Sequence, residues 1–372
     1  MSSPKFTFLE KPSAHVFPTL SAEQRAQKER LFAPKVKQID LDKIDSIDAL
    51  VDAYSGASIQ ARNIGRCAEV LERMVTDEDR PTILLGLAGP LVAAGLRKVI
   101  RDMIEHKLVD VIVSTGAILY QDFYQAQGFP HAVGTPDADD RALRDLYIDR
   151  IYDTYVDEEL FWRLDCSVGA FTDSLAPGRY SSRQFLEILG HTIKDPNSIL
   201  GAAARNGVPV FSPALNDSSL GIGLTEHYHR CLQEGRESVV IDSIRDNYEL
   251  TQIVVKSPAT SAIYVAGGVP KNFINDSVVM AYIFGLDTGG HRYAIQMTTD
   301  SPHWGGLSGS TLSEATSWGK VSKKATHSMA FVEPSVSLPL VAGSVIKKGS
   351  AKNRKRLAFE WNTPYLKSIK PV

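Results

Sequence analysis

Short apolar runs alternate with helical patterns through most of the chain. The runs are rich in β-branched residues and are bounded by turn residues, which is typical of strands. They predict strands at Thr82–Leu87, Asp110–Thr115, Val208–Ser212, Val239–Asp242, Ala262–Ala266, Tyr293–Thr298 and Ser328–Val332. Because these runs are continuously apolar rather than alternating, they indicate a sheet that is covered on both faces.

Between the runs, apolar residues recur at helical spacing. In Pro90–Lys107 they return every four residues from Leu91 to Met103, and a proline suits the first turn of a helix. Further helices are predicted at Ser182–Lys194, Thr225–Glu234, Pro270–Phe284 and Ser310–Trp318. This alternation predicts an α/β fold, with a doubly wound, mainly parallel sheet and helices on both faces.

The chain is expected to have three parts. Residues 1–40 are polar and form an N-terminal arm, residues 41–347 form the catalytic domain, and residues 348–372 form a basic C-terminal extension. We interpret the extension as a solvated end, with an oligomer contact as the alternative. The acidic and aromatic stretch Gly128–Asp165 interrupts the strand–helix alternation and predicts an insertion packed over one edge of the sheet.

Charge and cysteine content narrow the class of protein. A net charge of -2 disfavours a nucleic-acid binder, which usually carries a basic excess. Three widely spaced cysteines suit a reducing compartment and predict neither a disulfide framework nor a zinc site. His227 and His229 are two residues apart on a predicted helix, so they point in different directions and no metal site is expected.

The N-terminus MSSPKFTFLEKPSAHVFPTL lacks the apolar core of a signal peptide, and no apolar run approaches the ~20 residues of a membrane span. We therefore expect a cytoplasmic protein without membrane contact.

Ligands of doubly wound sheets bind beyond the carboxyl ends of the strands. Those ends are predicted at Gly86–Pro90, Thr115–Ala117, Ser212–Asp217, Asp242–Asp246 and Ala266–Gly268. No GxGxxG follows a strand, but AGG at Ala266–Gly268 and STGA at Ser114–Ala117 are placed where a backbone could approach a phosphate. On pattern alone, an ordinary strand–helix turn is the favoured interpretation of each.

Two further patterns carry candidate chemistry. SWGK (Ser317–Lys320) ends a predicted helix, and on pattern alone we favour a structural stop with Gly319 at the end and Trp318 in the core. The alternative is a functional lysine beside an indole, with Glu314 on the face of Trp318, an arrangement that suits a cationic ligand. Asp242 and Asp246 would serve ribose hydroxyls and a second cation, and a helix cap with a solvated face explains them equally well.

Five segments, in this order, resemble the deoxyhypusine synthase family. They are QARNIGRCAEVLERM (60–74), DVIVSTGA (110–117), NGVPVFSPALNDSSLG (206–221), AGGVPKNFI (266–274) and SEATSWGK (313–320). The resemblance spans about residues 40–347. It implies an NAD-binding fold without the usual glycine fingerprint and a homotetramer with active sites at dimer interfaces. It also implies transfer of an aminobutyl group from a polyamine, spermidine, through a lysine imine, with NAD as cofactor.

The resemblance also implies site residues. Lys320 is the catalytic lysine, which must be neutral to attack, so burial beside Trp318 and near a bound polyamine cation would favour its reaction. The expected polyamine-binding residues are Asp246, Glu314, Trp318, Ser308, Asn272 and Asp276. The expected NAD-binding residues are Thr115, Gly116, Asp242, Gly267, Gly268 and Glu333.

Several positions depart from the family pattern. Gln121 replaces a glutamate near the cofactor, Pro90 and Asp276 replace asparagines, Asn272 replaces a histidine, and Leu307 replaces an aspartate. Because these changes rearrange the carboxylates of the pocket, we expect a changed substrate or acceptor. The leading hypothesis is homospermidine synthesis, with putrescine as the acceptor. The alternatives are an authentic deoxyhypusine synthase, with a lysine of the hypusine-bearing translation factor as acceptor, and a noncatalytic NAD- or polyamine-binding protein.

Overall fold

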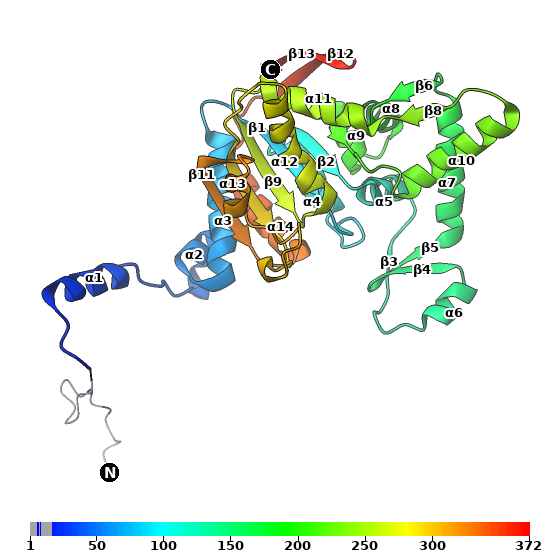
Figure 1. The fold of residues 1–372 in the computed structure, drawn as a ribbon. Coiled ribbons are helices and arrows are strands. Elements are labelled where there is room, and N and C mark those ends of the chain that lie inside the picture. Colours follow the sequence, from blue (N-terminus) through cyan, green and yellow to red (C-terminus); the bar gives the residue numbers. More distant parts are fainter. Residues whose placement is uncertain (1–5, 7, 9–16) are drawn as a thin grey trace. The chain divides into compact units, whose positions relative to one another are not determined.

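The computed structural model describes residue 6, residue 8 and residues 17–372 (Figure 1). The chain divides into two units, Met1–Gln38 and Ile39–Val372. In the described part of the first unit, α1 (Ala22–Phe32) begins with a capping box between Ser21 and Gln24, and none of its side chains is buried. Most of the stretch from which we expect no signal peptide lies outside the described residues.

A six-stranded sheet forms the centre of the second unit. Its order is β11 (Val321–Ala330), β10 (His291–Met297), β9 (Thr260–Val265), β1 (Thr82–Leu87), β2 (Val111–Ser114) and β7 (Val210–Phe211). Every neighbouring pair in this sheet is parallel. The predicted α/β fold with a mainly parallel sheet is confirmed, and β1 has the predicted bounds.

Helices cover both faces of this sheet, as predicted. Alternate residues of β1 point to opposite faces, so Ile83 and Leu85 join one apolar core and Leu84 joins the other. The first core lies under α2 (Ile47–Gly56), α3 (Ile59–Thr76), α4 (Arg97–Glu105), α5 (Gly116–Ala126), α8 (Ser182–Thr192), α9 (Ile199–Asn206) and α14 (Pro334–Lys348). The second lies under α11 (Ser243–Lys256), α12 (Gly268–Ile283) and α13 (Leu312–Ser317). α12 packs against β1, β2 and β9, and α14 packs against β10.

One predicted helix and one predicted strand differ from the structure in ways that bear on the site. The helix predicted from Pro90 begins only at Arg97, because Gly89 and Gly95 both adopt φ +87°, a conformation that no α-helix contains. The strand predicted at Val239–Asp242 exists as β8 (Val239–Ile241), but it pairs with β6 (Gly178–Tyr180) in a separate two-stranded sheet. Asp242 therefore does not follow a strand of the central sheet.

The acidic stretch after Gly128 carries a sheet of its own. β3 (Ala132–Val133), β5 (Thr154–Asp157) and β4 (Ile148–Ile151) form an antiparallel sheet beside α6 (Asp140–Asp145). The chain continues into α7 (Glu158–Asp173), which packs against α10 (Ser219–Glu234). These three strands pair only with one another, so they do not extend the central sheet.

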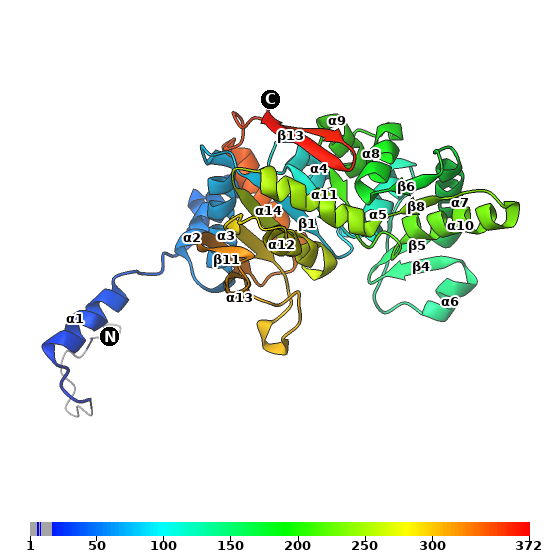
Figure 2. The ribbon, with the colours of Figure 1, turned by 45° about the horizontal axis from the view of Figure 1, so that its top comes forward.

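The prediction of a solvated C-terminal end is wrong. After α14 the chain forms a hairpin of β12 (Leu357–Asn362) and β13 (Tyr365–Pro371), which packs against α11 (Figure 2). Leu357 and Leu366 are buried. Arg354 is also buried and binds Asp110 with N–O distances of 2.6 and 3.2 Å. The prediction took the basic residues as a sign of solvent exposure, whereas Arg354 neutralises the buried carboxylate of Asp110.

The two edges of the central sheet differ. β7 has two residues, whereas β11 has ten and exposes Lys323 and Lys324. The start of β11 is polar, so the sequence predicted a strand only at Ser328–Val332, which overlaps the end of β11. Among the described residues, no helix combines the length and the apolar character that a membrane crossing requires.

Candidate active site

Lys320 follows a helix end of defined geometry. α13 ends at the cap residue Trp318, and Gly319 adopts φ +70°. The N–H of Gly319 bonds to the carbonyl of Thr316, and the N–H of Lys320 bonds to that of Ala315, both at 3.1 Å. This pair of bonds is a Schellman motif, which explains the glycine. The carbonyl of Lys320 accepts a bond from the N–H of His291 (3.0 Å), so the lysine backbone is fixed on both sides.

The structure brings the side chain of Lys320 together with three predicted site residues. Its Nζ lies 3.2 Å from Asp276 Oδ1 and 5.3 Å from the ring centroid of Trp318. Asn272, one turn before Asp276 on α12, donates from Nδ2 to Asp276 Oδ2 (2.9 Å). Trp318 is 67% exposed, so the interpretation of a core tryptophan is wrong. The site therefore holds an ammonium group between a carboxylate and an indole face, with space for a further ligand on the indole.

Ser308, Gly267 and Gly268 form a second group at the turn between β9 and α12. The backbone N–H of Gly268 donates to Ser308 Oγ (2.9 Å). A Cβ on Gly267 would lie 2.6 Å from the Cα of Ser308, so close packing requires that glycine. Gly268 has φ +62° and open space where its Cβ would lie, so this backbone remains accessible at a helix N-terminus.

Ala266, in the same turn, adopts φ +58°. A non-glycine residue in this region is strained by roughly 1–2 kcal/mol. Ala266→Gly is therefore expected to stabilise the fold by about 1 kcal/mol, measured as the free energy of urea unfolding. Ala262→Gly, within β9, is the matched control and is expected to destabilise it. A loss of stability in Ala266→Gly would show that its methyl group has a packing role larger than the strain.

Lys271 lies beside the second group, and the sequence analysis missed it. It lies on α12, is 1% exposed, and its Nζ contacts the carbonyl of Ser310 (2.7 Å) and Oε1 of Gln296 (3.0 Å). Burial lowers the pKa of Lys271 to about 8, while the charge of Glu314 opposes the shift and that of Lys320 adds to it. Glu314 is exposed on α13. Lys271 is part of the segment AGGVPKNFI. A lysine within an apolar helical pattern was the signal that could have identified it as a buried site residue.

The central sheet reverses its winding between β1 and β9. From β1 the chain proceeds outward through β2 to β7, and it returns to the other side of β1 to continue from β9 to β11. Such a switch point leaves a crevice at the carboxyl ends of the two strands, where ligands bind in open α/β sheets. Gly268 lies at the end of β9, and Thr115 lies beyond the end of β2. Thr115 and Gly116 begin α5, but a Cβ on Gly116 would lie 2.2 Å from Ser218 Oγ, so packing also explains this glycine.

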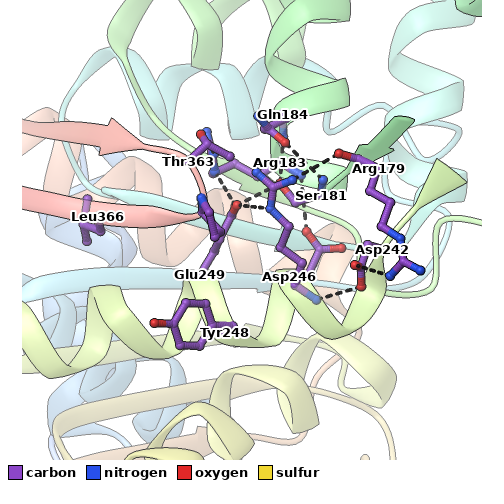
Figure 3. A network of polar contacts seen from close by, with 12 residues as sticks. Arg179, Ser181, Arg183, Gln184, Asp242, Asp246, Tyr248, Glu249, Thr363 and Leu366 are labelled. Carbon is purple, nitrogen blue, oxygen red and sulfur yellow. Dashed lines mark hydrogen bonds and ion pairs between the residues drawn. The ribbon is translucent and has the colours of Figure 1, made fainter. Parts of the chain in front are cut away.

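Asp242 and Asp246 form a third group at the amino end of α11 (Figure 3). Asp242 caps the helix by accepting from the N–H of Arg245 (3.1 Å), and its other oxygen lies 3.5 Å from Arg179. A cavity of about 560 Å³ opens beside it, lined on either side of Asp242 by Ile241 and Ser243. Its volume is within the range of small-molecule sites. Asp242 thus lies between two residues that line this cavity.

Asp246 is placed differently. It is 0% exposed, and its Oδ1 accepts from the N–H of Arg183 at the start of α8 (3.4 Å), while Oδ2 has no hydrogen-bond partner among the described residues. Burial raises the pKa of Asp246 to about 7, with a smaller contribution from the charge of Glu249. No contact among the described residues joins Asp242 or Asp246 to Lys320.

The buried carboxyl group predicts a pH dependence of stability. Because the folded pKa of Asp246 lies above its unfolded value, the folded state retains a proton that the unfolded state has lost between about pH 4 and 7. The contribution of Asp246 to stability therefore falls as the pH rises through this window. Asp246→Asn cannot ionise, so its stability relative to the unaltered protein is expected to rise by about 3 kcal/mol between pH 5 and pH 8. A difference in unfolding free energy that stays constant with pH would contradict this.

Comparison with known proteins decides the family. The family model described as deoxyhypusine synthase matches residues 49–345. A deoxyhypusine synthase-like protein from Chlorobaculum parvum is 42% identical over 91% of this chain and 96% of the relative. The chain belongs to the deoxyhypusine synthase family. A "Probable deoxyhypusine synthase 2" from Methanosarcina mazei is 42% identical over 86% of this chain and 92% of the relative.

A solved structure supports the fold. A crystal structure of a candidate deoxyhypusine synthase from Entamoeba histolytica aligns with 84% of this chain and 97% of its own, with a TM-score of 0.59 and 21% identity. Both the sequence relatives and this structure extend over most of the chain. The α/β architecture described above is therefore that of the deoxyhypusine synthase family.

Positions that depart from the deoxyhypusine synthase pattern have defined places. Gln121 on α5 is buried, and its Oε1 accepts from the N–H of Ala93 in the turn that includes Pro90 (3.2 Å). Leu307 is 47% exposed beside Ser308. Asp276 contacts both Asn272 and Lys320, as described above. The changes at Asp276 and Asn272 thus lie at or next to the Lys320 contact, and Gln121 and Pro90 meet at the turn after β1.

Two remaining residue groups do not join this site. Glu333 caps α14 by accepting from Ser335 and is exposed. Asp173, His227 and Cys231 lie close enough together to ligate a metal ion. However, the carboxylate of Asp173 already accepts bonds from Arg230 and Arg236, and these two cations disfavour a third. His229 is exposed and points away from His227, as its spacing predicts.

Proposed function

We propose that the protein transfers an aminobutyl group from spermidine, or a related polyamine, through an imine on Lys320 to an acceptor amine. The observation that carries this proposal is the placement of Lys320 Nζ, 3.2 Å from Asp276 Oδ1 and beside the exposed face of Trp318. In the covalent step, the amine of Lys320 attacks an imine carbon of the oxidised polyamine and 1,3-diaminopropane leaves. The acceptor amine then attacks the same carbon and releases Lys320.

The cofactor of this proposal is NAD, which would take a hydride from the carbon beside the secondary amine of spermidine and return it to the final imine. Two features fit this group: Gly268 leaves open space at the start of α12, at the switch point, and the residues on either side of Asp242 line a cavity of suitable volume. Asp242 would hold ribose hydroxyls, and Thr115 and Gly268 would lie near the phosphates. Glu333 is an expected contact on the adenosine side.

The residues around Lys320 would bind the polyamine. Asp276 and Glu314 supply carboxylates for ammonium groups, and Trp318 supplies an apolar face for the methylene chain. Bound ammonium groups would compete with Lys320 for Asp276. Asp246 is a proposed ammonium contact whose carboxylate is buried against α8, so this contact would require the residues that cover it to move.

The proposed acceptor is a small polyamine such as putrescine, which would make the reaction a homospermidine synthesis. Asn272, Asp276 and Leu307 support this, because the carboxylates beside Lys320 are rearranged relative to the family pattern. A homotetramer, implied by the family, would allow a second subunit to bring Asp242 and Asp246 near Lys320. Light scattering of the purified protein would measure the oligomeric state.

A second candidate is modification of a protein lysine. The name of the Methanosarcina mazei relative, "Probable deoxyhypusine synthase 2", favours it. Incubation with labelled spermidine and the hypusine-bearing translation factor distinguishes the two, because label on the factor would support the second candidate. A noncatalytic binding protein would form neither product, and the intact contacts of Lys320 argue against it.

The decisive experiment is mass spectrometry of the intact protein after incubation with NAD and spermidine and reduction with borohydride. The proposal predicts one aminobutyl adduct per chain, located on Lys320. No adduct with spermidine, and none with putrescine as the donor, would overturn the proposed function.

A further inference from the structure

The C-terminal hairpin lies beyond the segment that the family model matches, which ends at residue 345. It nevertheless makes specific polar contacts with α11. Gln252 donates from Nε2 to the carbonyl of Pro364 (2.8 Å) and accepts at Oε1 from the N–H of Leu366 (3.0 Å). Both polar atoms of one α11 side chain are therefore bonded to the hairpin backbone.

Arg183 provides a second link between the hairpin and α11. Its guanidinium carbon lies 4.1 Å from the ring centroid of Trp361, and its Nε donates to Glu249 Oε2 (2.7 Å). Figure 3 shows Arg183 between Glu249 and Thr363, with Asp246 nearby. The side chain of Arg183 is 3% exposed and that of Glu249 is fully buried, so water does not screen this ion pair. An indole face over a buried guanidinium adds a cation–π interaction and fixes the plane of the arginine.

These contacts are concentrated on one side of the hairpin. A cavity of about 270 Å³ is lined by Leu357, Phe359 and Trp361 of the hairpin together with Ala203 of α9 and Val210 of β7. The specific polar and cation–π contacts described above therefore lie on the side of α11 and Arg183.

The linked contacts reach the amino end of α11. Gln252, Glu249 and Asp246 lie one turn apart along this helix, and the first two are held by the hairpin or by Arg183. Asp242 caps the same helix, and its chain neighbours Ile241 and Ser243 line the cavity of about 560 Å³. A shift of α11 would thus move the carboxylate of Asp242 relative to that cavity.

We propose that the C-terminal hairpin is a positioning element for the cofactor, which acts through Trp361, Arg183 and Gln252 to fix the amino end of α11 so that Asp242 meets the ribose of NAD. This inference rests on the proposed function for its ligand. Trp361 and Gln252 are positioning residues, because neither borders the cavity beside Asp242.

The test compares Trp361→Ala with Trp361→Phe, which keeps an aromatic face over Arg183, and with Lys367→Ala, an exposed control on the same hairpin. Gln252→Ala is a second variant that leaves the apolar face of the hairpin intact. Two quantities are measured on the full-length protein: the affinity for NAD, by fluorescence titration, and amide hydrogen exchange in the first turns of α11. The turnover at saturating NAD is measured alongside.

Trp361→Ala and Gln252→Ala are expected to weaken NAD binding about 5- to 10-fold and to accelerate exchange in Ser243–Asn247. Turnover at saturating NAD is expected to stay within about twofold, because a less ordered α11 weakens NAD binding and an excess of NAD compensates for this. Trp361→Phe and Lys367→Ala are expected to resemble the unaltered protein. Unchanged exchange, or faster exchange with unchanged NAD affinity, would overturn the inference. If the unaltered protein binds no NAD, the proposed function fails instead, and the exchange data still decide whether the hairpin orders α11.

Discussion

Lys320→Ala is expected to lose aminobutyl transfer by at least about 1,000-fold and to form no borohydride-stable adduct. The amine of Lys320 carries the imine in the proposed reaction. Lys271, a second lysine whose pKa is influenced by Lys320, is buried with its Nζ bonded to Ser310 and Gln296, so it is not free to replace Lys320. The measurement is release of 1,3-diaminopropane from spermidine together with intact mass.

Lys323→Ala is the matched control, because Lys323 is an exposed lysine on β11 three residues later and is expected to leave the rate unchanged. A variant with retained spermidine binding but no adduct would identify Lys320 as the nucleophile. Full transfer by Lys320→Ala would instead show that the covalent mechanism is wrong, whatever its effect on binding.

The largest expected change in stability follows from Asp110. Its carboxylate is 3% exposed and accepts bonds from Arg80 and Arg354, and the N–H of Ile83 also donates to it. Asp110→Ala leaves two buried or partly buried guanidinium groups without their anion, which is expected to lower the unfolding free energy by about 3–5 kcal/mol. The midpoint of urea unfolding would report this loss.

An exposed ion pair supplies the control for Asp110. Asp79 is 65% exposed and lies 2.7 Å from Arg292, so Asp79→Ala is expected to change stability by less than about 1 kcal/mol. Burial raises the pKa of Asp110, but Arg354 and Arg80 outweigh it and lower the pKa below the ordinary aspartate value. The stabilisation is therefore complete above about pH 4 and is lost as the pH falls further. Equal losses of unfolding free energy in Asp110→Ala and Asp79→Ala would contradict a larger contribution from the buried ion pairs of Asp110.

The strands of the central sheet could be predicted because they are apolar on both faces. Thr82–Leu87 is such a strand, and its bounds match the prediction. The first part of β11 could not be predicted, since Lys323 and Lys324 occupy an edge that faces solvent. α1 was missed although Ser21 and Gln24 form a capping box, because its polar sequence has no apolar face.

The candidate site was only partly visible in the sequence. SWGK correctly indicated a glycine-terminated helix before Lys320, but pattern alone could not show that Trp318 is exposed. Gly116 and Gly267 suggested a phosphate site, whereas their Cβ positions are filled by Ser218 and Ser308. Such close approaches join segments that are distant in the chain, so local spacing does not encode them. The same reason explains why Arg354 could not be matched with Asp110.

The lysines of β11 also bear on how the protein behaves at high concentration. A long edge strand offers unpaired N–H and C=O groups to a strand of another molecule, which is a common start of aggregation. On this sheet, an incoming strand would have to approach Lys323 and Lys324, whose charges would repel a second copy of the same edge. The opposite edge, β7, has two residues and gives an incoming strand little to pair with. The central sheet is thus protected against growth into fibrils at both ends.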